Sequence, residues 1–464
     1  MVTANFSDRP ETENQPMPEG LENVRWFKPG VRAKSWAATV AGLLLILGAL
    51  SALIIRQVIP ATNHMTHGFI AYQVASRLLV AGQLGPQAYD DTWFSAQVRA
   101  SYDPTIGEIL TPSLPTMSLL ALPFVDLPPL QARNLWIWLN IPILLAMMGM
   151  LALVAARLWP GRAAGPWWAV IIALACLFPA VAANFRIGQF FIFFGLLFVV
   201  ALYGLVTEQS WLAGGALGLV LVSKALGWPF WLLLLVQKRW KVLAWATGTA
   251  LALGLITLPI IGFDTWRAYL QAASAYPSVP QVAATAFQTT HSFWTHLLRY
   301  DPVWNPVPLA NWPQAIPFLS LSIAVLTLGV TLWLGRSAPV AWLFVALTPL
   351  NIVLLPVGEQ HHFVALLIPI TLLGVSFVLD GAPVLDWVAA TAALLLLYAP
   401  IPFKSPEMGV GWLALLAYPR LYGAWLIWLL ALRRMRRDPT GQPTSGSLVE
   451  QPHLLEQSTG DQRG

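Results

Sequence analysis

The sequence is poor in charged residues. Asp, Glu, Lys and Arg together make up 10% of its 464 positions, whereas hydrophobic residues make up 57%. An ordinary soluble domain carries charge at about a quarter of its positions. A chain with so little charge cannot cover a water-facing surface, so the composition excludes a soluble globular protein and favours one integral membrane domain.

Cysteine is also nearly absent, because Cys176 is the only one and lies inside an apolar run. A single cysteine excludes a disulfide or a cysteine metal cluster within one chain. The phosphate-binding glycine loop, the dinucleotide fingerprint and the His-Glu-x-x-His helix are missing as well. The sequence therefore predicts no cofactor, and no spacing of residues predicts a metal site.

The net charge of +5 does not predict a nucleic-acid partner. The basic residues flank apolar runs, where the positive-inside rule accounts for them. We therefore expect membrane lipids, and no nucleic acid, around this chain.

The chain is rich in apolar segments that are long enough to cross a bilayer. The stretch from Trp211 to Val236 is harder to interpret, because Lys224, Gly227 and Pro229 divide it into two short pieces, which indicates a hairpin. The clear segments are 36–58, 132–156, 165–183, 188–206, 242–262, 314–335, 338–356, 361–379, 384–402 and 412–432. The sequence thus predicts an all-α, polytopic transmembrane protein with about 12 spans.

Basic clusters set the expected orientation. If the hairpin counts as two spans, the clusters at residues 157–162, 238–241, 336 and 433–437 share one side, which we expect to be cytoplasmic. This predicts a cytoplasmic tail over residues 1–35, a transmembrane domain over 36–432 and a disordered cytoplasmic tail over 433–464. The N-terminal segment is too long and too polar for a cleaved signal peptide, so we expect a multi-pass plasma (inner) membrane protein with both termini in the cytoplasm.

Two long segments, 59–130 and 263–313, then face outward. Apolar residues at helical spacing between Phe69 and Leu79 predict a short helix lying at the membrane interface in the first of them. Prolines divide the remainder into short pieces.

Polar groups near the hydrocarbon are costly, so those at span ends are candidates for function. Lys224 lies at the hairpin tip, where its ammonium either meets an anion such as a carboxylate or a lipid phosphate, or extends to the interface. Arg186 and Gln189 lie in a polar turn that either presents donors outward or only satisfies the backbone.

Histidines and carboxylates gather in the outward turns. Glu359, His361 and His362 stand almost together, and His67 and His291 lie in the two long outward segments. The main carboxylates of the first outward segment could serve as a general base, although loop carboxylates are more often merely solvated. They are Asp90, Asp91 and Glu108.

Several of these motifs, in this order, resemble glycosyltransferase family 87. They are Thr66-His67-Gly68-Phe69 with Tyr72, Tyr89-Asp90-Asp91, the proline-rich stretch after Glu108, Asn184 to Gln189, Gly214-Gly215 to Lys224, and Glu359-Gln360-His361-His362-Phe363-Val364. Together they extend from about residue 40 to 380. The resemblance implies a fold similar to that of C-type membrane glycosyltransferases.

The resemblance also implies an activity. Such an enzyme would move a hexose, typically mannose, from a polyprenyl phosphate carrier to a glycolipid or cell-envelope polysaccharide at the outer face, by a single inverting displacement. On this reading Lys224 and Arg186 hold the phosphate, and His361 and His362 bind phosphate or sugar. One of the three loop carboxylates supplies the base.

One departure concerns the base. Many C-type enzymes carry an aspartate directly after the first span, whereas residues 59–69 here contain two histidines and no acidic residue.

Two other functions stay open from the residues alone. One is a transporter or flippase for a lipid or an anionic solute, which broken helices also suit. The other is a catalytically silent membrane scaffold.

Overall fold

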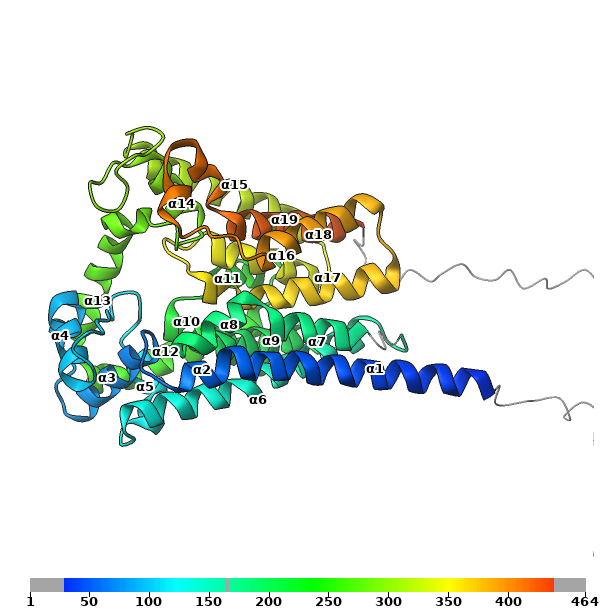
Figure 1. Ribbon diagram of the computed structural model, residues 1–464, viewed down its shortest axis with the longest axis horizontal. Coiled ribbons are helices and arrows are strands. Elements are labelled where there is room, and N and C mark those ends of the chain that lie inside the picture. Colours follow the sequence, from blue (N-terminus) through cyan, green and yellow to red (C-terminus); the bar gives the residue numbers. More distant parts are fainter. Residues whose placement is uncertain (1–28, 163–166, 438–464) are drawn as a thin grey trace, which may run out of the picture.

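The computed structural model describes residues 29–162 and 167–437. Its regular elements are helices, and the one β-type contact among these residues is an isolated bridge between Asp301 and Asn305. Most helices lie side by side along one long axis, with shorter elements gathered at one end (Figure 1). The predicted all-α class is confirmed.

Five helical stretches are long and apolar enough to cross a membrane, and a bent pair makes a sixth candidate. The five lie in α1 with η1 and α2 (Pro29–Leu53, Ile54–Val58, Ile59–Thr62), α6 (Pro129–Leu158), α12 (Trp240–Ile261), α15 (Ala315–Gly335), and η6 with α17 (Gln360–Leu366, Leu367–Asp380). The bent pair is α7 and α8 (Trp167–Leu177, Pro179–Ile187).

The other bundle helices are shorter. They are α9 (Phe191–Val206), α10 (Ser210–Lys224), α11 (Trp228–Val236), α16 (Val340–Val353), α18 (Val384–Tyr398) and α19 (Pro419–Arg437). A helix rises about 1.5 Å per residue, so most of these fall short of a hydrocarbon core of about 30 Å. The number of 12 spans therefore stays a prediction.

The elements of one end come from three parts of the chain. The first part holds α3 (Phe69–Val80), η2 (Pro86–Tyr89), α4 (Asp91–Ser101), α5 (Met117–Leu120) and η3 (Leu122–Phe124). The second holds α13 (Phe263–Ala275), η4 (Tyr276–Ser278), η5 (Pro280–Ala283) and α14 (Thr290–Leu298), and the third holds η7 (Pro406–Gly409) and η8 (Gly411–Leu416). We call this the loop end (left in Figure 1).

Two predicted segments differ from the helices observed. The segment 165–183 bends by 47° where Pro179 starts α8, because proline has no N–H to continue the hydrogen bonding of α7. The segment 412–432 begins in the 3-10 turn η8, and its helix, α19, starts only at Pro419 and continues to Arg437. Arginines in the last turn suit the negative pole of the helix dipole.

The helix predicted between Phe69 and Leu79 is confirmed as α3, but its surroundings are protein. All residues from Phe69 to Ser76 are buried. Gln73 donates through Nε2 to the carbonyl oxygen of Phe124 at 2.7 Å, and Arg77 donates through Nη2 to that of Leu127 at 2.8 Å. Loop carbonyls satisfy these polar groups, so α3 lies inside a folded lobe and not flat on the surface.

The hairpin predicted around Lys224 is confirmed. Helix α10 ends at Lys224, and Ala225 and Gly227 then adopt positive φ angles of 52° and 82°. Helix α11 runs back from Trp228 and ends shortly before α12 begins at Trp240. The first half of α10 packs against the start of α12. The tip of the hairpin therefore lies at one end of the bundle, and the start of α10 and the end of α11 lie at the other.

Small residues allow this close packing. A Cβ added at Gly214 would lie 2.5 Å from the carbonyl oxygen of Val242, and one at Gly218 would lie 2.5 Å from that of Ala246. The two glycines are four residues apart on one face of α10, the spacing that lets transmembrane helices approach closely. Gly215 lies between them, and a Cβ there would meet only Thr249 Oγ1, at 4.0 Å.

The predicted basic clusters meet at the end opposite the loop end, which we call the basic end. Gln237, after α11, donates to the carbonyl oxygens of Gly335 and Ala338. Trp342, in α16, contacts the ring of Trp159 and the guanidinium of Arg434. Residues 157–162, 237–241, 335–338 and 433–437 therefore share one end of the bundle.

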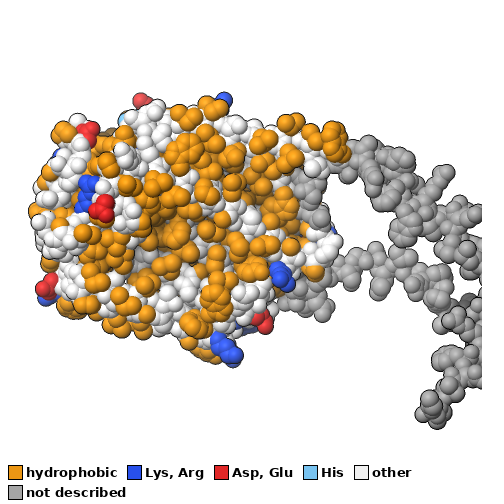
Figure 2. All heavy atoms as spheres, turned by 90° about the horizontal axis from the view of Figure 1, so that it is seen from below, with side chains coloured by type: hydrophobic (Ala, Val, Ile, Leu, Met, Phe, Trp, Pro, Cys, Tyr) orange, Lys and Arg blue, Asp and Glu red, His pale blue; other side chains and the backbone are white. Residues whose placement is uncertain are grey.

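The side of the bundle is apolar. Exposed large side chains include Leu44, Leu255, Phe318, Leu326 and Leu395, and hydrophobic side chains cover most of the face in Figure 2. Soluble monomers rarely expose apolar patches of this extent. The surface is that of an integral membrane protein.

The α10–α12 contact makes a prediction about stability. Gly218→Ala should lower the thermal unfolding midpoint of the purified protein in detergent, because overpacking typically costs about 1–3 kcal/mol. Gly215→Ala is the matched control on the same helix, and its midpoint should stay equal or rise. Equal midpoints for the two variants would contradict the close packing described above.

Candidate functional site

A buried arginine joins two turns of the loop end. Arg133, in α6, is fully buried, and its Nη1 donates to the carbonyl oxygens of Ala61 and His64. Its Nη2 donates to Thr66 Oγ1 and to the carbonyl oxygen of Arg186, both at 2.7 Å. The single guanidinium therefore holds the end of the first helix against the turn after α8.

Two glycines allow the same two turns to touch. Gly68 has φ +99°, and a Cβ there would lie 2.2 Å from the carbonyl oxygen of Ile187. Gly188 has φ +64°, and its Cβ would lie 2.9 Å from that of Phe69. Both positions require glycine, because L side chains rarely adopt such φ angles and have no space here.

Lys224 lies at the centre of a polar group at the loop end. Its Nζ donates to Ser113 Oγ at 2.6 Å and to the hydroxyl of Tyr72 at 3.3 Å. The hydroxyl of Tyr72 in turn donates to Gln189 Oε1 at 2.8 Å. Four segments thus supply one member each: the hairpin tip, α3, the proline-rich stretch and the turn after α8.

His67 and Glu108 form a second group. Glu108 Oε1 accepts a hydrogen bond from the backbone N–H of Gly68 at 2.5 Å and lies 3.5 Å from His67 Nδ1. His67 Nδ1 also lies 3.0 Å from the carbonyl oxygen of Gly107. The hydrogen bond with Glu108, aided by the charge of that carboxylate, raises the pKa of His67 above its usual 6.5.

The turn around Glu359 forms a third group. The backbone N–H of Glu359 donates to His362 Nδ1 at 3.2 Å, and Glu359 Oε2 lies 3.9 Å from His361 Nδ1. The rings of His361 and His362 pack on Phe191, and Asn184 Nδ2 donates to the carbonyl oxygen of His361 at 3.0 Å. This turn is therefore fixed against α8 and α9.

The charges of the three groups act on one another. Burial raises the pKa of Glu359, while the positive charges of Lys404, His67 and Lys224 lower it again and Glu108 raises it. The pKa of Glu359 therefore depends on charges from both other groups and from Lys404.

The charges of these groups also act on Tyr276, in the second long loop segment. Burial, together with the negative charges of Glu359, Asp91 and Glu108, raises its pKa to about 12. We call the whole set the loop-end site. Its members are His67, Tyr72, Glu108, Ser113, Gln189, Lys224, Tyr276, Glu359, His361, His362 and Lys404.

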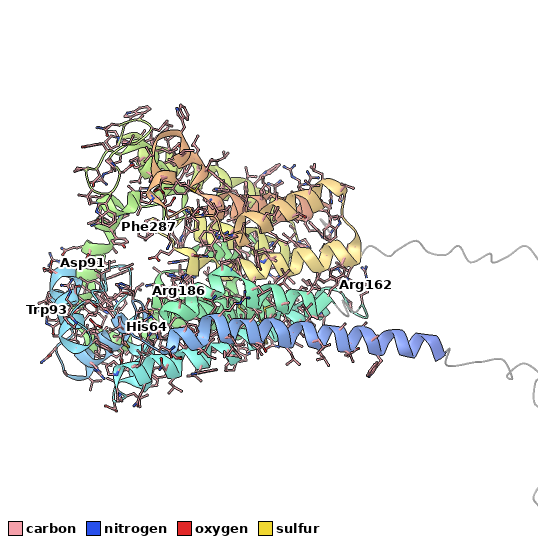
Figure 3. The ribbon with its side chains drawn as sticks, in the orientation of Figure 1. His64, Asp91, Trp93, Arg162, Arg186 and Phe287 are labelled. Atoms are coloured by element: carbon pink, nitrogen blue, oxygen red, sulfur yellow. The ribbon has the colours of Figure 1, made fainter. Side chains whose placement is uncertain are left out.

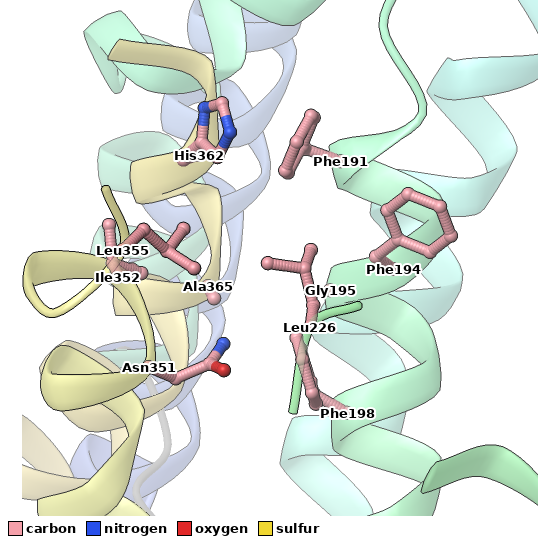
Figure 4. Close-up of a pocket in the computed structure, with 10 residues that line it drawn as sticks. All are labelled: Phe191, Phe194, Gly195, Phe198, Leu226, Asn351, Ile352, Leu355, His362 and Ala365. Atoms are coloured by element: carbon pink, nitrogen blue, oxygen red, sulfur yellow. The ribbon is translucent and has the colours of Figure 1, made fainter. Parts of the chain in front are cut away.

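An apolar hollow lies directly beneath His362. It is lined by Phe191, Phe194 and Phe198 of α9 on one side and by Asn351 and His362 on the other (Figure 4). Its volume of about 10 Å³ is room for one water molecule. The floor of the loop-end site is therefore aromatic and nearly closed.

Four candidate residues occupy other positions. Asp90 is the N-cap of α4 and accepts from the N–H of Trp93 at 2.9 Å, and His291 bonds to Ser320 Oγ and to the carbonyl oxygen of Pro277. The exposed side chain of Asp91 accepts a hydrogen bond from Thr111 Oγ1. Its charge contributes to the raised pKa of Tyr276. Arg186 has an exposed side chain near the inner edge of the loop end (Figure 3).

Sequence reasoning missed four members of the site. Tyr72 and Ser113 stood in recognised motifs, but nothing local marks a phenol or a hydroxyl as a partner of Lys224. Tyr276 lies in a loop without any pattern, and Lys404 stands in a short turn that we expect to face outward but that carries no motif. Within residues 29–162 and 167–437, no three His, Cys, Asp or Glu side chains are grouped as a metal site requires.

The fold and the site together define an integral membrane protein with a polar site at one end of its bundle. The sequence model of glycosyltransferase family 87 matches residues 115–357, more than half of the chain. The protein therefore belongs to glycosyltransferase family 87 and is a multi-pass membrane glycosyltransferase. No curated protein and no solved structure matches it. The matched range contains Lys224, whereas Glu108 precedes it and Glu359 follows it.

The buried Arg133 makes a prediction about the integrity of the site. Arg133→Met should lower the free energy of unfolding by about 3 kcal/mol or more, since hydrogen bonds to charged groups contribute about 1.5–3 kcal/mol each. Thermal unfolding in detergent measures the loss. Arg99→Met is the control, because Arg99 is exposed on α4. A midpoint for Arg133→Met equal to that of the control would rule out the anchoring role.

Proposed function

We propose that this protein transfers a hexose, with mannose as the first sugar to test, from a polyprenyl phosphate carrier to a glycolipid or cell-envelope polysaccharide. The reaction would take place at the outer face of the plasma membrane, with both termini in the cytoplasm. Family membership implies glycosyl transfer. The observation that carries the finer proposal is the Lys224 ammonium, which donates to Ser113 and Tyr72 and whose charge acts on Glu359.

The leaving group is the phosphate of the carrier. The acceptor hydroxyl attacks the anomeric carbon, the bond from that carbon to the phosphate oxygen breaks, and the configuration inverts. The negative charge that develops on the phosphate needs a fixed cation in a site with little water. Lys224 supplies that cation, and the exposed Arg186 at the rim can hold a second phosphate oxygen.

The base that removes the acceptor proton is the His67–Glu108 pair in this proposal. With Nδ1 donating to the carbonyl oxygen of Gly107, His67 keeps the lone pair of Nε2 for the proton. Glu108 then stabilises the imidazolium that forms, in the way an acid orients and supports a catalytic histidine. This places the base near the end of the first helix without an aspartate there. Asp90 has a capping role instead.

Lys224→Ala should lower kcat about 10²- to 10³-fold, the usual effect of removing one preorganised group that stabilises transition-state charge. The measurement is transfer of labelled mannose from polyprenyl phosphate mannose to a lipid acceptor by protein in vesicles. Lys241→Ala, at the basic end, is the control and should keep full activity. Full activity of a folded Lys224→Ala protein would refute the phosphate role.

The His67–Glu108 pair makes a prediction about pH. A base must be neutral, so kcat/KM should rise with pH through the raised pKa of His67, above 6.5. Glu108→Gln removes the anion that favours the imidazolium, so this limb should move to lower pH. His67→Gln should abolish the limb and lower kcat about 10²- to 10⁴-fold, whereas His64→Gln, an exposed neighbour, should not. An unchanged limb in both site variants would sink the assignment.

A further inference from the structure

A second, larger hollow lies between α7, α17, α18 and α19, nearer the basic end. Its volume is about 220 Å³, and its lining includes Ile171, Gly374, Phe377, Trp387 and Leu430. An engineered apolar cavity of about 150 Å³ already binds benzene. The hollow is therefore large enough for part of a hydrocarbon chain.

This hollow is open at the side of the bundle. Three of its lining residues are substantially exposed: Trp167 by 47%, Val170 by 36% and Trp387 by 42%. It has one buried hydroxyl, Thr371 Oγ1, which has no hydrogen-bond partner in the described chain. Since the side of the bundle is the apolar surface that a bilayer covers, the molecules available to enter are lipid chains.

Positive charge surrounds the end of the hollow. Asp380 pairs with Arg162 at 2.8 Å and with Arg434 at 2.7 Å. Asp386 is likewise paired with two arginines, Arg433 at 2.8 Å and Arg437 at 2.7 Å. Four guanidinium groups thus face two carboxylates, which leaves an excess of positive charge.

The charged groups and the hollow lie on the same helices. Phe377 precedes Asp380 by less than one turn of α17, and Trp387 directly follows Asp386 in α18. Leu430 likewise precedes Arg433 by less than one turn of α19. Arg436, in the same last turn, is exposed and has no ion pair with any residue from 29–162 or 167–437.

We propose that an anionic phospholipid binds here, with one acyl chain in the hollow and its phosphate on the arginines of the basic end. Arginine suits this role because its planar fork of donors matches phosphate oxygens. Basic pockets between transmembrane helices are a recurring form of anionic lipid site. The sugar carrier is a different ligand, because its phosphate would bind Lys224 at the opposite end of the bundle.

The test is thermal unfolding of the purified full chain in detergent, titrated with phosphatidylglycerol or phosphatidylcholine. A ligand that binds only the folded state raises the midpoint in a saturable manner. We expect phosphatidylglycerol to do so at lower concentration than phosphatidylcholine. This readout does not depend on sugar transfer, so it can fail or succeed separately from the proposed activity.

Two pairs of variants locate the site. A Cβ at Gly374 meets no atom within 4 Å, so Gly374→Phe fills the hollow without a backbone clash. It should abolish the phosphatidylglycerol effect. Gly329→Phe is its control, because Gly329 has the same free space on α15, outside the hollow.

The second pair tests the headgroup. Arg436→Gln should raise the half-saturating concentration of phosphatidylglycerol about fivefold, since one basic residue near a membrane surface contributes about that much. Lys241→Gln should not.

Two results would overturn the proposal. In the first, both lipids raise the midpoint equally in the parent protein, which would mean that the arginines select no headgroup. In the second, Gly374→Phe responds to phosphatidylglycerol as Gly329→Phe does, which would mean that no acyl chain occupies the hollow.

Discussion

The loop-end site depends on one costly group, the ammonium of Lys224 at the tip of a hairpin between apolar helices. An amine in such a place needs polar partners or an anion, because burying a charge without them costs several kcal/mol. Ser113, Tyr72 and, through Tyr72, Gln189 provide these partners. They come from three separate parts of the chain, so satisfying one amine brings α3, the proline-rich stretch and the turn after α8 to the same point. The site is a consequence of that requirement.

A second set of contacts, made by Arg133, joins two of the turns that border the site. Arg133 has four oxygen partners in the turns that carry His67 and Arg186, and Gly68 and Gly188 allow those turns to touch. The Gly214 and Gly218 face of α10 then sets the depth of the hairpin against α12. The packing of these glycines against α12 thus sets the position of Lys224, the last residue of α10. The basic end lies opposite, where Arg162, Arg433, Arg434 and Arg437 pair with Asp380 and Asp386 across the helix ends.

Much of the site could be predicted from single residues because membrane proteins place few charges near hydrocarbon. The candidates on that ground alone include Lys224, Glu108, Glu359, His361 and Gln189. All five belong to the loop-end site. Asp90 and His291 were candidates on the same ground, but Asp90 caps a helix, and His291 bonds to the carbonyl oxygen of Pro277 and to Ser320 of α15. A sequence does not distinguish a carboxylate that caps a helix from one that faces a cavity, because both stand in polar loops. Tyr276 could not be found at all, since nothing local marks it, and Lys404 stands in a turn that we expect to face outward but that carries no motif.

The sequence by itself determined the helical class, the α10–α11 hairpin and the sharing of one end by the basic clusters. These follow from local composition, since apolar length and the positions of charge dictate what lipid can accept. Only the tertiary structure decided that α3 is enclosed by protein, that the helix before Pro179 bends and that His67 pairs with Glu108. Each of these results depends on contacts between residues at least 40 positions apart or on the packing around a proline, and neither leaves a periodic signal along the chain.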